Sequence, residues 1–235
     1  NMMDTTFIKN LLEQLKPELQ KHFHYLHTHP ELSFQEYKTT EYIKKELLSF
    51  GIELQDMDSP TGVVGILQGK PTGKCVALRA DIDALPIKET SSCQFPSTVS
   101  GISHACGHDA HITCLLGAAK ILSQVKDKIP GTVKFIFQPG EEGAGGAVYL
   151  TQKGCMEQPK VDAIFGLHNA PTVASHKLGL KSGGIMAAVH KFTVTLTGKG
   201  GHGAIPETNI DSIVAAAAMI QSLQTITSRN VPPSQ

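Results

Sequence analysis

The sequence lacks an excess of charge of either sign, because its 21 Lys and Arg residues balance 21 Asp and Glu residues and no basic run stands out. It therefore carries no electrostatic footprint for nucleic acid or for an anionic membrane, and we expect neither as a partner. Long apolar runs are also missing. The longest, residues 213–220, is far shorter than the roughly 20 residues of a transmembrane helix, so no membrane-spanning segment is expected.

Two further absences bear on cellular location. The N-terminal residues have no apolar secretory core, since an amphipathic stretch with Lys9, Glu13 and Lys16 follows directly. The 5 cysteines are odd in number and contain no C-x-x-C pair, which fits reduced thiols better than a disulfide framework. Both features predict a cytoplasmic protein. Internal repeats and low-complexity tracts are also missing.

The composition is that of a folded chain. Hydrophobic residues make up 40% and charged residues 18% of the 235 residues, so apolar surface is ample for a packed core. This length allows one large domain, or one domain with part of another.

Helical patterns occupy the N-terminal part. Residues 5–25 place apolar side chains on one face, and this helix is expected to bend at Pro17. Residues 34–50 predict a second helix, with Ser33 and Glu36 spaced as a capping box at its start.

The pattern then changes to short β-branched or apolar runs, with one helical segment between the second and third run. This order predicts a mixed α/β fold, with a largely buried sheet flanked by helices, over residues 1–185. The four expected strands are residues 63–67, 75–80, 132–137 and 161–167.

A second unit is expected over residues 186–235. It shows an alternating strand at 190–197 and a helix at about 210–227, typical of the start of an α+β domain. One strand and one helix cannot bury a core of their own. We therefore expect either completion by another chain or a truncated protein.

Candidate ligands follow three of the expected strands. Asp81 and Asp83 come after the second strand, Glu141 and Glu142 after the third, and His168 after the fourth. Ligands of open α/β sheets bind at the carboxyl ends of strands, so these side chains are expected to share one crevice.

The segment 104–111 adds softer ligands, Cys106 and His108, before the central helix. Thiolate, imidazole and carboxylate together suit zinc, while manganese, cobalt and nickel stay open. Without C-x-x-C knuckles, a catalytic site with an open position is favoured over a structural one. Of the adjacent Glu141 and Glu142, one would bind metal and the other would move protons. For His104 or His111 alone, a role inside the core is favoured over one as a ligand.

Two other patterns are set aside. The histidines at 22, 24, 27 and 29 are interpreted as mainly structural, exposed residues at a helix end, where the helix dipole favours them without a metal. Residues 198–203 spell G-x-G-x-x-G, but Pro206 delays the helix and no acidic residue stands near 220, so a nucleotide site is rejected.

Six motifs in one order carry a family resemblance. The sequence resembles the metal-dependent N-acyl-amino-acid amidohydrolases, a family that includes hippurate hydrolases, auxin-conjugate hydrolases and N-acetyl-diaminopimelate deacetylases. The motifs are HPELS at 29–33, RADIDALP at 79–86, HACGHD at 104–109, FQPGEEG at 137–143, GLH at 166–168 and GGHGA at 200–204.

The resemblance implies a catalytic domain with two divalent metal ions, which would be Zn, Mn, Co or Ni, and a small N-acyl amino acid as substrate. Cys106 would be shared between the metals, with His108, Glu142 and His168 as the other ligands, and Glu141 would be the general base.

It also implies an inserted lid domain that forms the homodimer contact. His202 on this lid would hydrogen-bond the developing oxyanion, and Asp81, Asp83 and Asp109 would orient the ligands. Family members are longer, with a last histidine ligand beyond residue 235, so a truncated chain is expected.

Two alternatives stay open. The chain could act only as a metal-binding or dimerising scaffold, which metal retention without turnover would favour. Alternatively, Cys106 could be the nucleophile of a cysteine hydrolase, insensitive to chelators, although that scheme leaves Glu141 and Glu142 unexplained.

Overall fold

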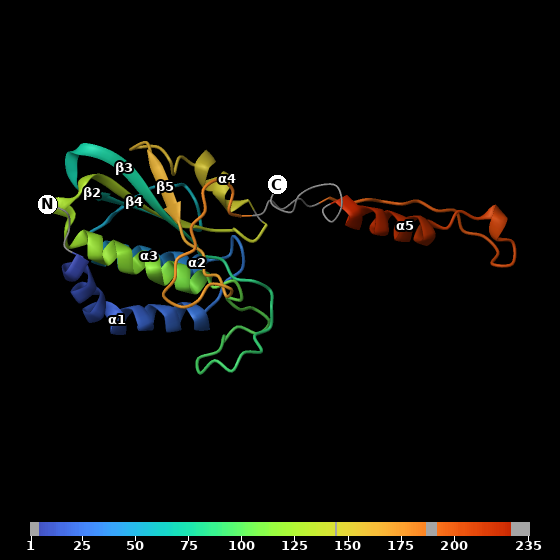
Figure 1. Cartoon of the computed structure of the whole chain (residues 1–235), viewed down its shortest axis with the longest axis horizontal. Coiled ribbons are helices and arrows are strands. Elements are labelled where there is room, and N and C mark those ends of the chain that lie inside the picture. Colours follow the sequence, from blue (N-terminus) through green and yellow to red (C-terminus); the bar gives the residue numbers. More distant parts are fainter. Residues whose placement is uncertain (1–4, 144, 187–191, 227–235) are drawn as a thin grey trace. The chain divides into compact units, whose positions relative to one another are not determined.

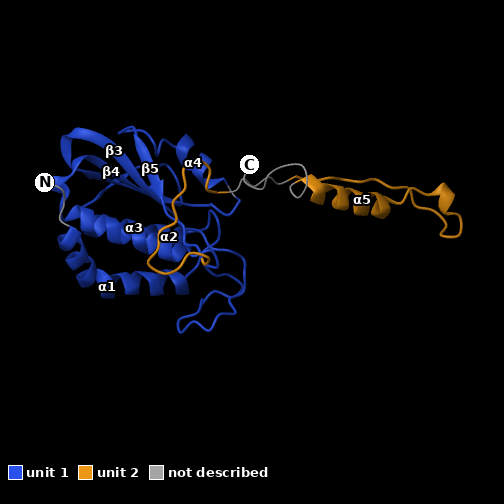
Figure 2. Ribbon diagram, in the orientation of Figure 1, with its two compact units in different colours: residues 1–170 blue, residues 171–235 orange. Residues whose placement is uncertain are grey.

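The structure is a computed structural model, and it describes residues 5–143, 145–186 and 192–226. The chain forms two compact units, residues 1–170 and 171–235, coloured separately in Figure 2. Within the described ranges, no helix is both long and apolar enough to cross a membrane. The domain boundary expected after residue 185 stays a prediction.

A mixed five-stranded sheet is the centre of the first unit (Figure 1). Its strand order is β1-β2-β4-β3-β5, in which β3, β4 and β5 are parallel and β1 and β2 are antiparallel. The four predicted strands and the mixed α/β class are confirmed. The short β1 was not predicted. The strands are β1 (Glu53–Gln55), β2 (Val63–Gln68), β3 (Lys70–Asp81), β4 (Pro130–Gln138) and β5 (Ala163–Gly166).

Helices cover both faces of this sheet (Figure 1). Helices α1 (Thr5–Thr28), α2 (Tyr37–Ser49) and α3 (His108–Ser123) contribute to the larger apolar cluster on one face. The short helix α4 (Gly146–Gln152) packs against the other face through Leu150. A 3-10 turn, η1 (Lys126–Lys128), precedes β4. The predicted central helix is therefore confirmed as α3.

Strand β4 contributes side chains to the apolar clusters on both faces of the sheet. Val133, Phe135 and Phe137 belong to the cluster under α1–α3, and Ile136 belongs to the cluster under α4. This follows from the two-residue period of a strand, because successive side chains point to opposite faces. Both faces are covered, so β4 is buried along nearly its whole length.

The capping box predicted at Ser33 and Glu36 is wrong. Helix α2 begins at Tyr37, and Glu36 makes no side-chain cap. Instead, the Ser33 hydroxyl donates to Asp83 Oδ2 at 2.6 Å, and Glu36 Oε1 accepts from the Gly140 amide at 2.9 Å. Both side chains are used for tertiary contacts, which a local spacing rule does not detect.

The interpretation of the histidines at 22, 24, 27 and 29 as exposed is also wrong for two of them. His22 is buried, and its Nδ1 lies 2.6 Å from the Tyr42 hydroxyl. His27 is half-buried, and its Nδ1 lies 2.6 Å from Asp109 Oδ2. These two rings face elements far away in the sequence, so the helix dipole does not explain them. His24 and His29 are exposed, as expected.

The second unit contains the predicted C-terminal helix, α5 (Ser212–Thr225), and a 3-10 turn, η2 (Pro206–Thr208). The Asp211 carboxylate caps α5 by accepting from the amides of Ile213 and Val214. The strand predicted at 190–197 is not found over 192–197, and residues 190 and 191 lie outside the described residues. An alternating sequence becomes a strand only with a hydrogen-bonded neighbour. The described residues of this unit show only an isolated bridge, between Lys199 and Ile210.

One buried cation supports the α4 side of the sheet. Lys134 is fully buried in β4, where its ammonium donates to Gln55 Oε1 at 2.9 Å, to the Cys155 carbonyl at 3.2 Å and to the Glu157 carbonyl. The ammonium therefore ties β1 and the segment after α4 to the centre of the sheet.

We predict that Lys134→Met lowers the free energy of unfolding by roughly 1–3 kcal/mol, because buried acceptors lose their donor. Denaturant unfolding would measure this change, with Lys126→Met in the exposed turn η1 as a matched control. Equal unfolding midpoints for the two variants would contradict the role of Lys134.

Candidate metal centre

The candidate site lies where three parallel strands end. Asp81 is the last residue of β3 and pairs in register with Gln138 at the end of β4. Glu141 and Glu142 follow β4 within four residues, and His168 lies two residues beyond β5. Parallel pairing thus brings together the ends that the sequence analysis expected to share one edge.

A tight turn before α3 brings Cys106 and His108 to the same edge. Gly107 adopts a left-handed conformation with φ of 85° and caps the helix that begins at His108. A Cβ atom at Gly107 would lie 2.7 Å from the side chain of Asn169. Both the backbone conformation and the close approach therefore require glycine at this position.

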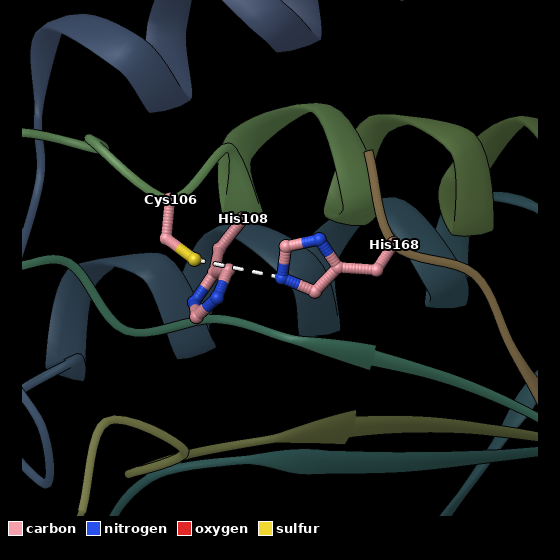
Figure 3. Close-up of side chains that lie close together, drawn as sticks. All are labelled: Cys106, His108 and His168. Atoms are coloured by element: carbon pink, nitrogen blue, oxygen red, sulfur yellow. Dashed lines mark hydrogen bonds between the residues drawn. The ribbon is translucent and has the colours of Figure 1, made fainter. Parts of the chain in front are cut away.

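The thiol and two imidazoles converge, as Figure 3 shows. Cys106 Sγ lies 3.5 Å from His168 Nε2, and the ligand atoms of Cys106, His108 and His168 lie within 4.8 Å of one another. His108 Nε2 also lies 3.9 Å from Glu141 Oε2 and 3.8 Å from Glu142 Oε1. Side chains from separate chain segments thus gather around His108 Nε2.

The hydrogen bonds of His108 and His168 leave the Nε2 atom of each ring available to a metal ion. His108 Nδ1 lies 2.8 Å from the carbonyl of Asp83, and His168 Nδ1 lies 2.7 Å from the carbonyl of Asn169. A carbonyl oxygen only accepts, so each ring carries its proton on Nδ1 and, when neutral, a lone pair on Nε2. This is the arrangement that a carbonyl gives to metal-binding histidines.

Among the buried polar atoms that have no hydrogen-bond partner within the described part of the chain, two belong to candidate ligands: His108 Nε2 and Glu142 Oε1. Burial of unpaired polar atoms is costly, so such atoms call for an explanation. A cation between the imidazole nitrogen and the carboxylate would satisfy both. The residues present therefore fit a metal ion.

The site concentrates negative charge. Burial lowers the pKa of His108, but its hydrogen bond to Asp83 and the charge of Asp81 outweigh burial and raise it. Burial and the charge of Glu142 raise the pKa of Glu141, and the same two causes raise the pKa of Cys106 to about 12. Nucleophilic cysteines need positive surroundings, so this environment argues against Cys106 as a nucleophile and for a bound cation.

A buried network supports His168. Asp81 accepts from Arg79 Nη1 through Oδ2 and pairs with His111 Nδ1 through Oδ1, each at 2.7 Å. His111 Nε2 in turn lies 3.0 Å from the amide and 2.7 Å from Oδ1 of Asn169. The network thus runs from the sheet, through His111, to the residue whose carbonyl orients His168.

Asp83 holds the other side of the site. Its Oδ2 accepts from Ser33 at 2.6 Å and from the amide of Glu142 at 3.0 Å. Burial acts in the opposite direction, but hydrogen bonds to His108 and Ser33 lower the pKa of Asp83 to about 2. Asp83 is therefore ionised and orients both a candidate ligand and the loop that carries Glu142.

Two other predicted residues have different hydrogen-bond partners. Asp109 is buried, but its oxygens contact His27 Nδ1 and the Ala110 amide instead of a candidate ligand. His202 belongs to the second unit, where its Nδ1 accepts from the Ala204 amide at 3.1 Å. The individual roles of all the site residues stay predictions.

Sequence reasoning favoured a core role for His111, which is buried as expected, but it did not identify several of the residues that hold the site. His111 lies three positions after His108 and so shares a face of α3 with it, a spacing that could have identified it. It also forms a potential ligand group with Asp81 and His108, although both of its nitrogens already have partners. For Asn169 and Glu36, no spacing or motif in the sequence indicated their contacts at the site.

Comparisons with known proteins agree with this geometry. The family described as Peptidase family M20/M25/M40 matches residues 77–234. An N-acetyl-L-cysteine deacetylase of Bacillus subtilis is 46% identical over 90% of this chain and 50% of its own length. An N-acyl-L-amino acid amidohydrolase of Geobacillus stearothermophilus is 43% identical over 96% of this chain and 61% of its own length.

Among solved structures, a Bacillus subtilis protein described as a dinuclear metal binding peptidase of the M20 family is similar, with a TM-score of 0.62 and 43% identity. The match covers 72% of this chain and 45% of that protein. The chain spans about half the length of the relatives it matches. Since the family match covers more than half of its residues, the chain belongs to the peptidase family M20/M25/M40.

Proposed function

We propose that this chain carries the metal centre of an enzyme that hydrolyses the amide bond of small N-acyl amino acids. The observation that carries the proposal is the convergence of Cys106, His108 and His168 on one point, with Glu142 beside it and Glu141 adjacent. The names of two relatives, an N-acetyl-L-cysteine deacetylase and an N-acyl-L-amino acid amidohydrolase, support this substrate class.

The donor set would hold divalent ions. Cys106 would be shared by two ions, with His108, Glu142 and His168 completing the ligands that this chain supplies. The similarity to a solved structure described as a dinuclear metal binding peptidase supports two ions. Thiolate, imidazole and carboxylate suit zinc, and manganese, cobalt or nickel are accepted by the same donors. Bound ions would lower the pKa of water toward neutrality and polarise the amide carbonyl.

Glu141 would then act as the general base. Its raised pKa, caused by burial and by Glu142, is closer to neutrality than that of an ordinary glutamate, which favours proton transfer in both directions. Its side chain is 41% exposed, so it can reach a substrate and solvent. Glu141 would accept a proton from the attacking water and pass it to the leaving amine.

His202 would stabilise the oxyanion that forms on the amide carbonyl. Its Nδ1 accepts a hydrogen bond from the Ala204 amide, so a neutral ring carries its proton on Nε2, which is then a donor. Loss of one such donor typically lowers the rate by about 100–1,000-fold. We also propose that the chain forms a homodimer through the second unit. Its proposed location is the cytoplasm.

The general-base role gives the first prediction. Glu141→Gln should retain bound metal but lose turnover by at least about 100-fold, because the amide cannot accept a proton. Elemental analysis would measure the bound metal, and hydrolysis of hippurate and N-acetyl amino acids would measure turnover. The matched variant is Glu142→Gln, which should lose metal. Substantial turnover by Glu141→Gln would overturn this role. Metal retention without turnover in the unchanged chain would favour the scaffold alternative.

The network under His168 gives a second prediction. His111→Gln should weaken divalent metal binding by about 10–100-fold, because Asn169 loses the ring that positions it. Competition with a coloured chelator would measure the dissociation constant, with His176→Phe, at an exposed position of the second unit, as control. An unchanged dissociation constant in a folded His111→Gln chain would show that His111 does not position the ligands.

A further inference from the structure

A second cluster of ligating side chains lies outside the site described above. It consists of His27 at the end of α1 and of Glu89 and Cys93 in the loop between β3 and α3. Their ligand atoms lie within 4.8 Å of one another, and His27 Nε2 lies 3.1 Å from Glu89 Oε1. Imidazole, carboxylate and thiol thus meet from two parts of the chain.

His27 is oriented as a ligand. Its Nδ1 lies 2.6 Å from Oδ2 of the buried Asp109, while its Nε2 faces Glu89. A carboxylate behind an imidazole fixes the ring and makes its other nitrogen a better donor to a metal, the pairing seen at many zinc sites. This gives a function to the Asp109 carboxylate, whose hydrogen bonds go to His27 and to the Ala110 amide and not to a candidate ligand of the first centre.

Glu89 is held in place and ionised. Its Oε1 accepts from the Ser91 hydroxyl at 2.5 Å, and its Oε2 accepts from the Ser97 amide at 2.7 Å. These two hydrogen bonds contribute most to lowering the pKa of Glu89 to about 2. The Cys93 amide donates to the same Ser91 hydroxyl at 3.4 Å, which ties the cysteine backbone to the carboxylate.

The cluster opens on a cavity of about 300 Å³ that His27 and Glu89 line together with His104. His104 is only 6% exposed, and neither of its ring nitrogens has a hydrogen-bond partner among the residues that the structure describes. A buried imidazole without partners is costly, so it indicates a ligand or ordered water in the cavity. This observation is independent of the cluster itself.

We propose that His27 Nε2, the Glu89 carboxylate and the Cys93 thiolate bind one further divalent ion of the zinc class. The remaining coordination position would open into the cavity beside His104. One nitrogen, one oxygen and one sulfur donor suit zinc, and a distance of 3.1 Å between two donors fits their separation around one small ion.

Binding would release protons. Cys93 would lose its thiol proton, and His27 would lose a proton whenever it is an imidazolium, with both protons passing to solvent. The ion would connect the loop between β3 and α3 to the end of α1. This assignment does not depend on the proposed function, because it uses none of the residues assigned there to catalysis or metal binding.

Cobalt(II) provides the test, because a thiolate bound to cobalt gives an intense near-ultraviolet absorption band. In a Cys106→Ser chain, which lacks the thiol of the other centre, we expect this band to persist. Adding Cys93→Ser should abolish it together with one bound ion, whereas adding Cys114→Ser, at an exposed cysteine of α3, should leave both unchanged. Glu89→Gln in the same background should weaken cobalt binding by at least about 10-fold.

Absence of the band in Cys106→Ser, or its persistence after Cys93→Ser, would overturn the proposal. Circular dichroism of the metal-free variants establishes that they are folded. If Cys106→Ser does not fold, the same comparison applies to the unchanged chain. There, Cys93→Ser must reduce the band and the cobalt content while Cys114→Ser does not.

Discussion

The parallel pairing of β3 with β4 is the constraint on which the candidate metal centre depends. Their register sets Asp81 opposite Gln138, so the loops that follow the two strands leave the sheet side by side. The Glu142 amide can then donate to Asp83, whose carbonyl in turn accepts from His108. A shift of this register would move the carboxylates away from the imidazole.

A second consequence of this arrangement is electrostatic. Asp81, Asp83, Glu141 and Glu142 all lie near one buried imidazole, and protein donors neutralise only part of this charge. Arg79 pairs with Asp81, and Ser33 donates to Asp83, but Glu142 Oε1 has no hydrogen-bond partner in the described residues. Burial raises the pKa of Glu141, and the like charge of the nearby Glu142 raises it further. A divalent cation relieves this repulsion.

Much of the fold followed from the sequence because its signals are local. The β-branched runs predicted four strands, and the apolar spacing of α3 predicted the central helix. Parallel strands with their ends at one edge then predicted that Glu141, Glu142 and His168 lie together. The positions of the candidate ligands were predictable because each candidate follows a regular element or lies near the start of one.

The residues that support those ligands were less predictable. Ser33 and Glu36 fit a capping box, yet both side chains contact loops at least 50 residues away. His27 was grouped with exposed neighbours, but it lies against Asp109 and Glu89. The alternating run at 192–197 has no strand partner in the described part of its unit. In each case the presence or absence of a contact distant in sequence decided the outcome.

The most direct test of the metal centre is an anomalous difference map from crystals of the zinc-loaded chain, recorded at the zinc absorption edge. The account predicts a strong peak within about 2.0–2.4 Å of Cys106 Sγ and His108 Nε2, with Glu142 or His168 as a further ligand. A fully loaded protein whose anomalous peaks all lie away from Cys106 and His108 would contradict it.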